Sequence, residues 1–368
     1  MRFRSLLLLL SLSAGLSACL VLSAPDRQAH PVEPQTGQKP NIVGYLPLYK
    51  GVADSISNEQ LANLTHLNLA FANPDASGQF TQGDAFTCMS AGAGQPVHVE
   101  QIRAVVSQAH QAGVKVVLSV GGGWIPDCSG DWRQLLNDSH RHQIVANLIN
   151  LVSDLDLDGV DIDLEGVLLT QIDQDGHYTP FIRELSTQLR AKSRLLTVAT
   201  ASYQGGMIPK AAIGYFDLIY LMSYDAIGPS WGVAGTEHAT LQQAQHDLQL
   251  WLDRGASQQQ LVLGLPFYGY GFGQYRSDYS ISELVASYGS EILHRDVIGQ
   301  PCAGCDYITY NGLNTLTAKT QLASKLASGV MIWELTHDLP AKGSLLNYIY
   351  TQLNGITAEK GLESSATR

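Results

Sequence analysis

The chain has 368 residues, 45% of them hydrophobic and 15% charged, with a formal net charge of −11 at pH 7. This composition is typical of a globular protein and the length allows one large domain. Nucleic-acid-binding surfaces need clustered Lys and Arg, so the acidic balance argues against a nucleic-acid partner.

The first nineteen residues have the pattern of an export signal. Arg2 and Arg4 precede a leucine-rich run, and the sequence LSAC at 16–19 resembles the lipobox of bacterial lipoproteins. We therefore expect a signal peptide over residues 1–19 and acylation of Cys19, which would hold the protein at the cell envelope. Ordinary secretion and an uncleaved anchor are the alternatives. No other membrane contact is expected, and the protein is expected to be a monomer.

A tether and then a barrel are predicted downstream. Residues 20–40 hold four prolines among polar residues, which is typical of a flexible linker. Strand-like and helix-like segments then alternate, which predicts parallel β/α architecture. Strands are expected at 41–49, 65–73, 115–122, 158–166, 195–202, 217–225, 261–270 and 329–336. Helices are expected at 97–112, 131–154, 179–191, 240–254, 318–327 and 343–354. Eight strands predict one (β/α)8 barrel over residues 41–354, followed by a tail at 355–368.

Four cysteines remain if Cys19 is acylated. Four cysteines in an exported chain indicate two disulfides, with three possible pairings. We favour Cys88–Cys128 and Cys302–Cys305. A redox role for the last pair lacks a thioredoxin-like context, and neither a second CxxC nor a paired His spacing supports zinc. No metal and no cofactor are expected.

Active sites of such barrels lie at the carboxyl ends of the strands. Four predicted strand ends carry unusual residues, namely SVGG at 119–122, DGVDIDLEG at 158–166, MSYD at 222–225, and WE at 333–334. The chemistry is therefore sought in these four segments.

The fourth strand gives the sharpest prediction. Side chains alternate along a strand, so Asp161, Asp163 and Glu165 share one face and apolar residues occupy the other. If the apolar face packs on the helices, the three acids line the barrel interior up to its mouth. Repulsion and desolvation there raise at least one pKa, which suits Glu165 as a general acid. Removal of Asp163 is accordingly expected to lower the pKa of Glu165.

Two other interpretations of these acids fit less well. A solvated acidic face conflicts with the apolar residues between the acids, which demand burial of the strand. A calcium-binding loop conflicts with the short, alternating spacing, which does not match an EF-hand.

These motifs resemble glycoside hydrolase family 18, the chitinases and endo-β-N-acetylglucosaminidases. DGVDIDLE is similar to the family's DxxDxDxE signature, and SVGG at 119–122 to its SxGG on the third strand. MSYD at 222–225 is similar to its MxYD on the sixth strand, and Trp333 to its tryptophan at the floor of the site. The matches occur in family order and span nearly all of residues 41–354.

The resemblance implies retaining, substrate-assisted cleavage of β-1,4 bonds between N-acetylglucosamine units. Glu165 would protonate the glycosidic oxygen and later activate water, while the sugar's acetamido oxygen attacks the anomeric carbon. Asp163 would orient the acetamido N–H and stabilise the oxazolinium-like intermediate. Asp161 would hold or exchange a proton with Asp163, and Tyr224 would bond the acetamido oxygen.

Further residues are expected to bind the substrate or support the site. Asp225 would assist at the same sugar and Trp333 would stack under it, while Ser119 and Tyr45 would hydrogen-bond to Asp161. The full set of substrate-binding candidates is Asp225, Trp333, Met222, Ser119, Gly122 and Tyr45.

The sequence departs from the family pattern at two places. Leu164 stands where many chitinases carry an aromatic residue, and its outward direction predicts repacking only. Residues 272–317 are too few for a large α+β insertion after the seventh strand. The barrel is therefore expected to lack that insertion and its wall over the groove. The resulting shallow cleft would favour cutting within chains.

Three functions are kept open. The leading one is hydrolysis of chitin or chito-oligosaccharides, and the second is cleavage of the chitobiose core of N-glycans. Loop aromatics could stack on a linear glycan in either case; these are Trp124, Trp231, Tyr268 and Tyr270. The third is a non-catalytic glycan-binding protein, against which the retained acid Glu165 argues.

Overall fold

The computed structural model describes residues 39–52, 56–90, 94–340 and 343–355. The predicted signal peptide, Cys19 and the tether up to residue 38 lie outside the described residues, as does the tail from residue 356 onward. Within the described ranges, none of the helices has the length and apolar character needed to cross a membrane.

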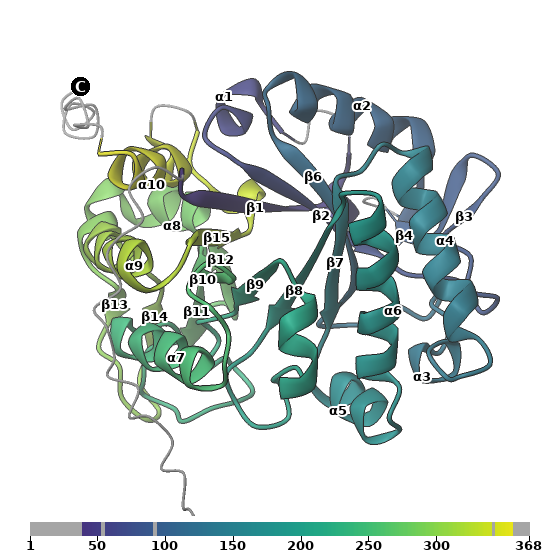
Figure 1. The fold of residues 1–368 in the computed structure, drawn as a ribbon. Helices are drawn as coiled ribbons and strands as arrows, with labels where there is room; N and C mark the ends of the chain where they lie inside the picture. The colour runs from purple at the N-terminus through teal and green to yellow at the C-terminus, as the bar shows by residue number, and fades with distance from the viewer. Residues whose placement is uncertain (1–38, 53–55, 91–93, 341–342, 356–368) are drawn as a thin grey trace, which may run out of the picture. The chain divides into compact units, whose positions relative to one another are not determined.

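Eight parallel strands close into a barrel in the order β1-β15-β10-β9-β8-β7-β6-β2 (Figure 1). In that closed ring β1 pairs with β15 on one side and with β2 on the other. The single (β/α)8 barrel predicted from the sequence is therefore confirmed. Its strands are β1 (Asn41–Pro47), β2 (His66–Ala72), β6 (Lys115–Gly122), β7 (Gly159–Leu164), β8 (Leu195–Thr200), β9 (Leu218–Leu221), β10 (Leu261–Pro266) and β15 (Gly329–Trp333).

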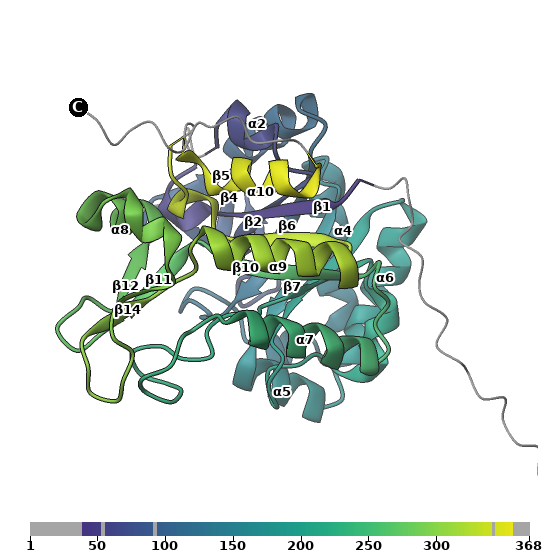
Figure 2. The same ribbon diagram turned by 90° about the vertical axis from the view of Figure 1, so that its left-hand side faces the viewer.

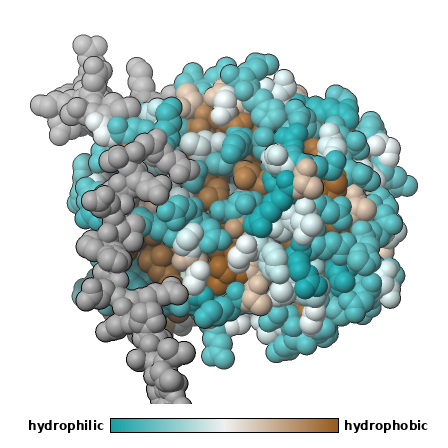
Figure 3. Space-filling view, in the orientation of Figure 1, coloured by the Kyte–Doolittle hydropathy of each residue, from teal (hydrophilic) through white to brown (hydrophobic). Residues whose placement is uncertain are grey.

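Helices surround the barrel and present polar faces to solvent. Figure 3 shows a mainly hydrophilic surface, with hydrophobic residues visible chiefly between polar side chains. The α-helices are α1 (Asn58–Leu61), α2 (Val99–Gln111), α3 (Trp132–Leu135), α4 (Arg141–Asp154), α5 (Gly166–Gln174), α6 (Tyr178–Ala191), α7 (Leu241–Asp253), α8 (Ile281–Tyr288), α9 (Leu313–Leu326) and α10 (Leu345–Leu353). Short 3-10 helices are η1 (Leu48–Lys50), η3 (Lys210–Tyr215), η4 (Ser290–His294) and η5 (Leu335–His337).

Two helix predictions need correction. The helix expected at 131–154 is broken into α3 and α4. Asn137 accepts hydrogen bonds on its side chain from the backbone N–H groups of Ser139 and His140, at 2.9 and 3.1 Å. Such a local side-chain bond competes with the helical ladder and starts a new segment. Helix α5, which follows β7 directly, was not predicted.

The strand predicted at 261–270 is also divided. β10 ends at Pro266, and the chain then enters a separate antiparallel sheet of order β12-β11-β14-β13. These strands are β11 (Tyr268–Phe272), β12 (Asp278–Ser280), β13 (Val297–Gly299) and β14 (Tyr307–Thr309). Figure 2 shows this sheet and α8 projecting beyond one end of the barrel.

This small sheet with α8 is called the β10–α9 insertion below. Strands of three to five residues need little chain, so a compact α+β unit fits where a large insertion would not. As predicted, no large α+β insertion follows β10, and this compact unit occupies its place. The preference for cutting within chains stays a prediction.

A third sheet and two disulfides complete the connections. The β2–α2 connection holds β3 (Thr81–Gln82), β4 (Ala85–Ser90) and β5 (Pro96–His98). Cys88 on β4 is bonded to Cys128 in the connection after β6, with 5.5 Å between their Cα atoms. Cys302 is bonded to Cys305 in the β13–β14 loop. Both favoured pairings are confirmed.

Candidate active site

The carboxylates of β7 lie as the alternation predicts. Asp161 and Asp163 are buried inside the barrel, and Glu165 follows at the end of the strand. The apolar residues between them, including Ile162 and Leu164, belong to the outer core between strands and helices. The three acids therefore form one line from the barrel interior to its mouth.

Asp161, the deepest acid, is held by three hydroxyl groups. Its Oδ2 accepts from Tyr45 and Ser119, each at 2.7 Å, and its Oδ1 accepts from Thr197 at 2.7 Å. Burial raises the pKa of Asp161, while these hydrogen bonds oppose that rise by stabilising the ionised form. The contacts of Tyr45 and Ser119 agree with the prediction. Thr197 on β8 was not predicted as a site residue, because a threonine within a strand carries no distinctive sequence pattern.

Asp163 is the acid most strongly biased towards its protonated form. Burial raises its pKa well above the usual value, and the charges of Glu165 and Asp161 add to the rise. Its Oδ1 is buried without a hydrogen-bond partner among the described residues. A hydrogen bond with Glu165 raises the pKa of Asp163 and lowers that of Glu165. The protonation of Asp163 and that of Glu165 therefore depend on each other through this hydrogen bond.

Glu165 is poised as a general acid. Burial and then the charge of Asp225 raise its pKa to about 7. The sequence suggested that repulsion within β7 would dominate this rise. In the structure burial comes first, the acting like charge comes from the β9 end, and Asp163 works in the opposite direction. On this hydrogen bond, removal of Asp163 should raise the pKa of Glu165, whereas the alternation of β7 predicted a fall; the pH profile of an Asp163 variant decides between them.

Three glycines at the end of β6, Gly121 to Gly123, leave room for neighbouring side chains and backbone of the site. A Cβ on Gly121 would lie 2.6 Å from the backbone oxygen of Asp163, and one on Gly123 would lie 3.0 Å from Oε1 of Glu165. A Cβ on Gly122 would lie 2.9 Å from the ring of Phe71. The contribution of Gly122 is thus to leave room for the ring of Phe71. Gly123 was missed, although it extends the same glycine run.

Trp333 forms an aromatic floor with two neighbours. Its ring lies 5.3 Å from the ring of Tyr45, edge to face, and 5.7 Å from that of Phe71, stacked. Phe71 belongs to β2 and was not predicted. Trp333 keeps part of its surface accessible, so a sugar could stack on it.

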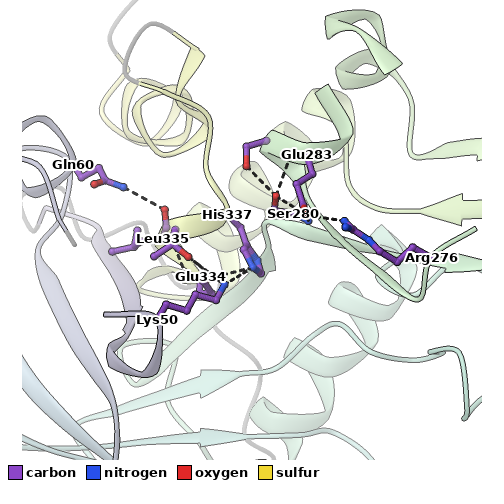
Figure 4. A network of polar contacts seen from close by, with 10 residues as sticks. Lys50, Gln60, Arg276, Ser280, Glu283, Glu334, Leu335 and His337 are labelled. Atoms are coloured by element: carbon purple, nitrogen blue, oxygen red, sulfur yellow. Dashed lines mark hydrogen bonds and ion pairs between the residues drawn. The ribbon is translucent and has the colours of Figure 1, made fainter. Parts of the chain in front are cut away.

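Glu334, the residue after Trp333, lies in a polar cluster with Lys50 and His337 (Figure 4), and its carboxylate accepts from the backbone N–H of Thr336 at 2.7 Å. Its carboxylate is almost fully buried and lies 2.6 Å from Nζ of Lys50 and 2.9 Å from Nε2 of His337. Burial works to raise the pKa of Glu334, but His337 and Lys50 outweigh it and lower the pKa to about 2. The ring of His337 lies 6.3 Å from that of Tyr268, so this cluster joins the eighth barrel strand to the β10–α9 insertion.

A cavity of about 680 Å³ opens beside Glu165, within the range of small-ligand sites. It lies between the ends of β8 and β9 and the start of α7. The predicted residues Glu165, Met222, Tyr224 and Asp225 line it. Trp231, named above as a possible stacking residue, also lines it. The lining residues that were not predicted are Ala201, Ser202, Tyr203, Ala226, Gln243 and Asp247.

Asp225 links the β9 end to the insertion. Its backbone is left-handed, with φ 60°, which turns the chain out of the barrel after Tyr224. The hydroxyl of Tyr268 on β11 donates to Oδ1 of Asp225. The ring of Tyr268 also packs on that of Tyr224, at 6.1 Å. The strand predicted to reach Asp225 instead ends at Leu221, because this turn leaves the sheet.

Comparisons with known proteins agree with this geometry. The model "Glycosyl hydrolases family 18" matches residues 41–338. The chain is 25% identical to probable chitinase 10 of Drosophila melanogaster, over 69% of this chain and 14% of that protein. It is 24% identical to chitinase A1 of Niallia circulans, over 88% of this chain and 60% of that protein. The chain thus spans less than two thirds of these two relatives.

Solved structures give the same result. The structure is similar to the GH18 chitinase ChiB of Flavobacterium johnsoniae, with TM-score 0.72, 30% identity, and coverage of 87% of this chain and 96% of that one. A chitinase from Bacteroides thetaiotaomicron gives TM-score 0.68 and 25% identity over 86% and 97% of the two chains. With the family model matched across most of the barrel, the chain belongs to glycosyl hydrolases family 18.

Proposed function

We propose that this protein is a chitinase-like hydrolase that cleaves β-1,4 bonds between N-acetylglucosamine units with retention of configuration. The observation that carries the proposal is the state of Glu165. Its pKa of about 7 leaves a protonated fraction near neutral pH, at the edge of a cavity that also holds Tyr224 and Asp225. An acid in this state can donate a proton to a leaving group.

In the first step the proton of Glu165 passes to the glycosidic oxygen as the C1–O bond breaks. The acetamido oxygen of the same sugar forms the new bond to C1, which leaves positive charge on the oxazolinium ring. The proton of Asp163 passes to Asp161, and the resulting Asp163 carboxylate accepts a hydrogen bond from the acetamido N–H and stabilises that charge. Tyr224 and Asp225, which line the cavity beside Glu165, hold the acetamido group.

In the second step water attacks C1 and gives its proton to the Glu165 carboxylate. The oxazolinium ring opens, the acetamido group is restored, and the product keeps the β configuration because C1 is attacked twice. Trp333 with Phe71 and Tyr45 supplies the apolar surface beneath the reacting sugar.

Exposed aromatic rings support an extended glycan as the substrate. Trp124, Tyr203 and Trp231 follow β6, β8 and β9 and are 75%, 61% and 46% exposed. Large apolar side chains that face water at the mouth of a barrel are suited to stacking on sugar rings. Several such rings in different loops favour a substrate longer than one sugar.

Product analysis tests this proposal. Purified protein is incubated with chitotetraose and, in parallel, with a high-mannose glycopeptide, and proton NMR follows the fresh product. Cleavage of chitotetraose with initial β product is expected. Cleavage of the glycopeptide alone would overturn the substrate, and initial α product would overturn the acetamido mechanism.

A variant of the acid provides the control. Glu165→Gln keeps the size of the side chain and removes the proton donor, so turnover should fall by about 10² to 10⁴-fold. Binding of chitotetraose, measured by calorimetry, should persist. Near-normal turnover of the folded variant would contradict the role of Glu165.

A further inference from the structure

A buried histidine stands behind Asp225, outside the motifs predicted from the sequence. His238 lies between β9 and α7 and is 0% exposed. Neither ring nitrogen has a hydrogen-bond partner among the described residues. Its Nδ1 lies 3.7 Å from Oδ1 of Asp225. A buried polar ring without a partner is costly, so its retention beside a carboxylate of the cavity calls for an explanation.

The ring of His238 is packed against the β10–α9 insertion. Its centre lies 5.2 Å from the ring centre of Tyr268 and 5.3 Å from that of Tyr270. The hydroxyl of Tyr268 donates to the same Oδ1 of Asp225 that His238 approaches. Two side chains from different elements therefore converge on one oxygen atom of Asp225.

The backbone around His238 is held by three elements. Its carbonyl oxygen accepts from the N–H of Ala226 at 3.0 Å, and its N–H donates to Oγ1 of Thr309 on β14 at 3.3 Å. The carbonyl of the next residue, Ala239, accepts from Nζ of Lys319 on α9 at 2.9 Å. These contacts leave the imidazole little freedom to move away from Asp225.

The surroundings favour a neutral imidazole. Burial lowers the pKa of His238, and the charge of Lys319 lowers it further, while Asp225 opposes both. Burial also raises the pKa of Tyr268 well above its usual value, and that of Tyr270 in the same direction, so both phenols are neutral neighbours. A neutral imidazole has one N–H to donate.

We propose that His238 is a positioning residue whose Nδ1–H donates to Asp225 when a sugar fills the cavity. The inference rests on the proposed function, in which Asp225 holds the acetamido group. At 3.7 Å the contact is too long for a hydrogen bond at rest. Hydrogen bonds of catalytic groups are often long without substrate and tighten in the complex. With Tyr268 on the same oxygen, His238 holds the Asp225 carboxylate aimed at the sugar.

Two substitutions distinguish the role of the Nδ1–H donor of His238 from the role of its ring in packing. His238→Phe keeps the packing against Tyr268 and Tyr270 and removes the donor. A lost hydrogen bond to a charged group predicts a fall in kcat/KM on chitotetraose of about 10- to 100-fold. His238→Asn places an amide nitrogen close to the position of Nδ1, so it should recover most of the loss. An active Phe variant, or an Asn variant as poor as the Phe variant at equal Tm, would overturn the proposal.

A double-mutant cycle tests whether the effect passes through Asp225. In an Asp225→Ala background, His238→Phe should cause no further loss of kcat/KM, because the partner is already gone. Losses that multiply in the double variant would mean that the ring supports the fold alone, and the proposal would be wrong.

One readout is independent of hydrolysis. Nitrogen-15 imidazole NMR, with His238→Phe to assign one of eleven histidines, should show a neutral ring protonated on Nδ1. The Nε2–H tautomer would exclude donation to Asp225. A wild-type protein with the Nδ1–H tautomer that cleaves no N-acetylglucosamine oligomer would refute the proposed function but not the His238–Asp225 contact.

Discussion

At the scale of single residues, the chemistry of Glu165 depends on two acids that act in opposite directions. Asp225 raises the pKa of Glu165 through its charge, and Asp163 lowers it through a hydrogen bond. Glu165 therefore has one neighbour that favours its protonated form and another that favours its carboxylate form. General acid and general base steps need both forms in turn.

This opposition predicts two shifts of the pH profile. Asp225→Asn removes the like charge, so the pKa of Glu165 should fall below about 7 and the alkaline limb of kcat/KM should move to lower pH. Asp163→Ala removes the hydrogen bond to the carboxylate, so the limb should move to higher pH. Both variants will also be slower, and the limb is measured relative to each variant's own maximum on a soluble chito-oligosaccharide.

The direction of each shift is what tests the assignment. Coupled acids titrate as a set, so Asp161 can reduce the size of the Asp163→Ala shift without reversing it. If both variants shift in the same direction, repulsion within β7 governs Glu165 and the roles given to Asp163 and Asp225 are wrong.

At the scale of elements, the sequence predicted what local patterns encode. The alternation of β7 predicted both its burial and the facing of Asp161 and Asp163, because a period of two needs no knowledge of the partner strands. The strands of the β10–α9 insertion were missed because three to five residues are too few to establish a period. Helix α5 was not predicted because it lies between β7 and α6, whose sequence patterns are clearer.

The missed site residues have a common cause. Thr197, Phe71 and Asp247 carry no unusual local pattern, and only closure of the barrel and docking of α7 bring them to the site. Tyr268 was named only as a possible stacking residue, since its bond to Asp225 requires the insertion to fold back on the β9 end. The motifs therefore identify the reacting groups, whereas tertiary structure selects the groups that hold them.

The two disulfides should differ in their effect on stability. Cys88 and Cys128 are separated by 40 residues, and Cys302 and Cys305 by 3. In the chain-entropy model, removal of the first bond costs roughly 4 kcal/mol and removal of the second roughly 2 kcal/mol. The double variants Cys88→Ala/Cys128→Ala and Cys302→Ala/Cys305→Ala form a matched pair for urea unfolding. A larger loss for the second pair would contradict the loop-length account.

At the scale of the whole molecule, the barrel and its site are complete within the described residues, from β1 to α10. The signals for export and anchoring are therefore sought in the sequence that precedes the barrel. We propose that Cys19 is acylated and that residues 20–40 connect it to the enzyme. Two disulfides are consistent with an oxidising compartment, and so with export.

Acylation of Cys19 predicts a specific change in location. A mature chain with two or more acyl chains should partition with membranes, because two chains suffice for stable anchoring. The full-length protein, expressed in a bacterial host with an alkyne-labelled fatty acid, should carry the label and sediment with the envelope. Cys19→Ser should lose the label, whereas Cys302→Ser/Cys305→Ser should keep it and control for thiol substitution. Label on the Cys19→Ser protein would refute this anchor, and an unlabelled wild-type protein in the medium would support ordinary secretion instead.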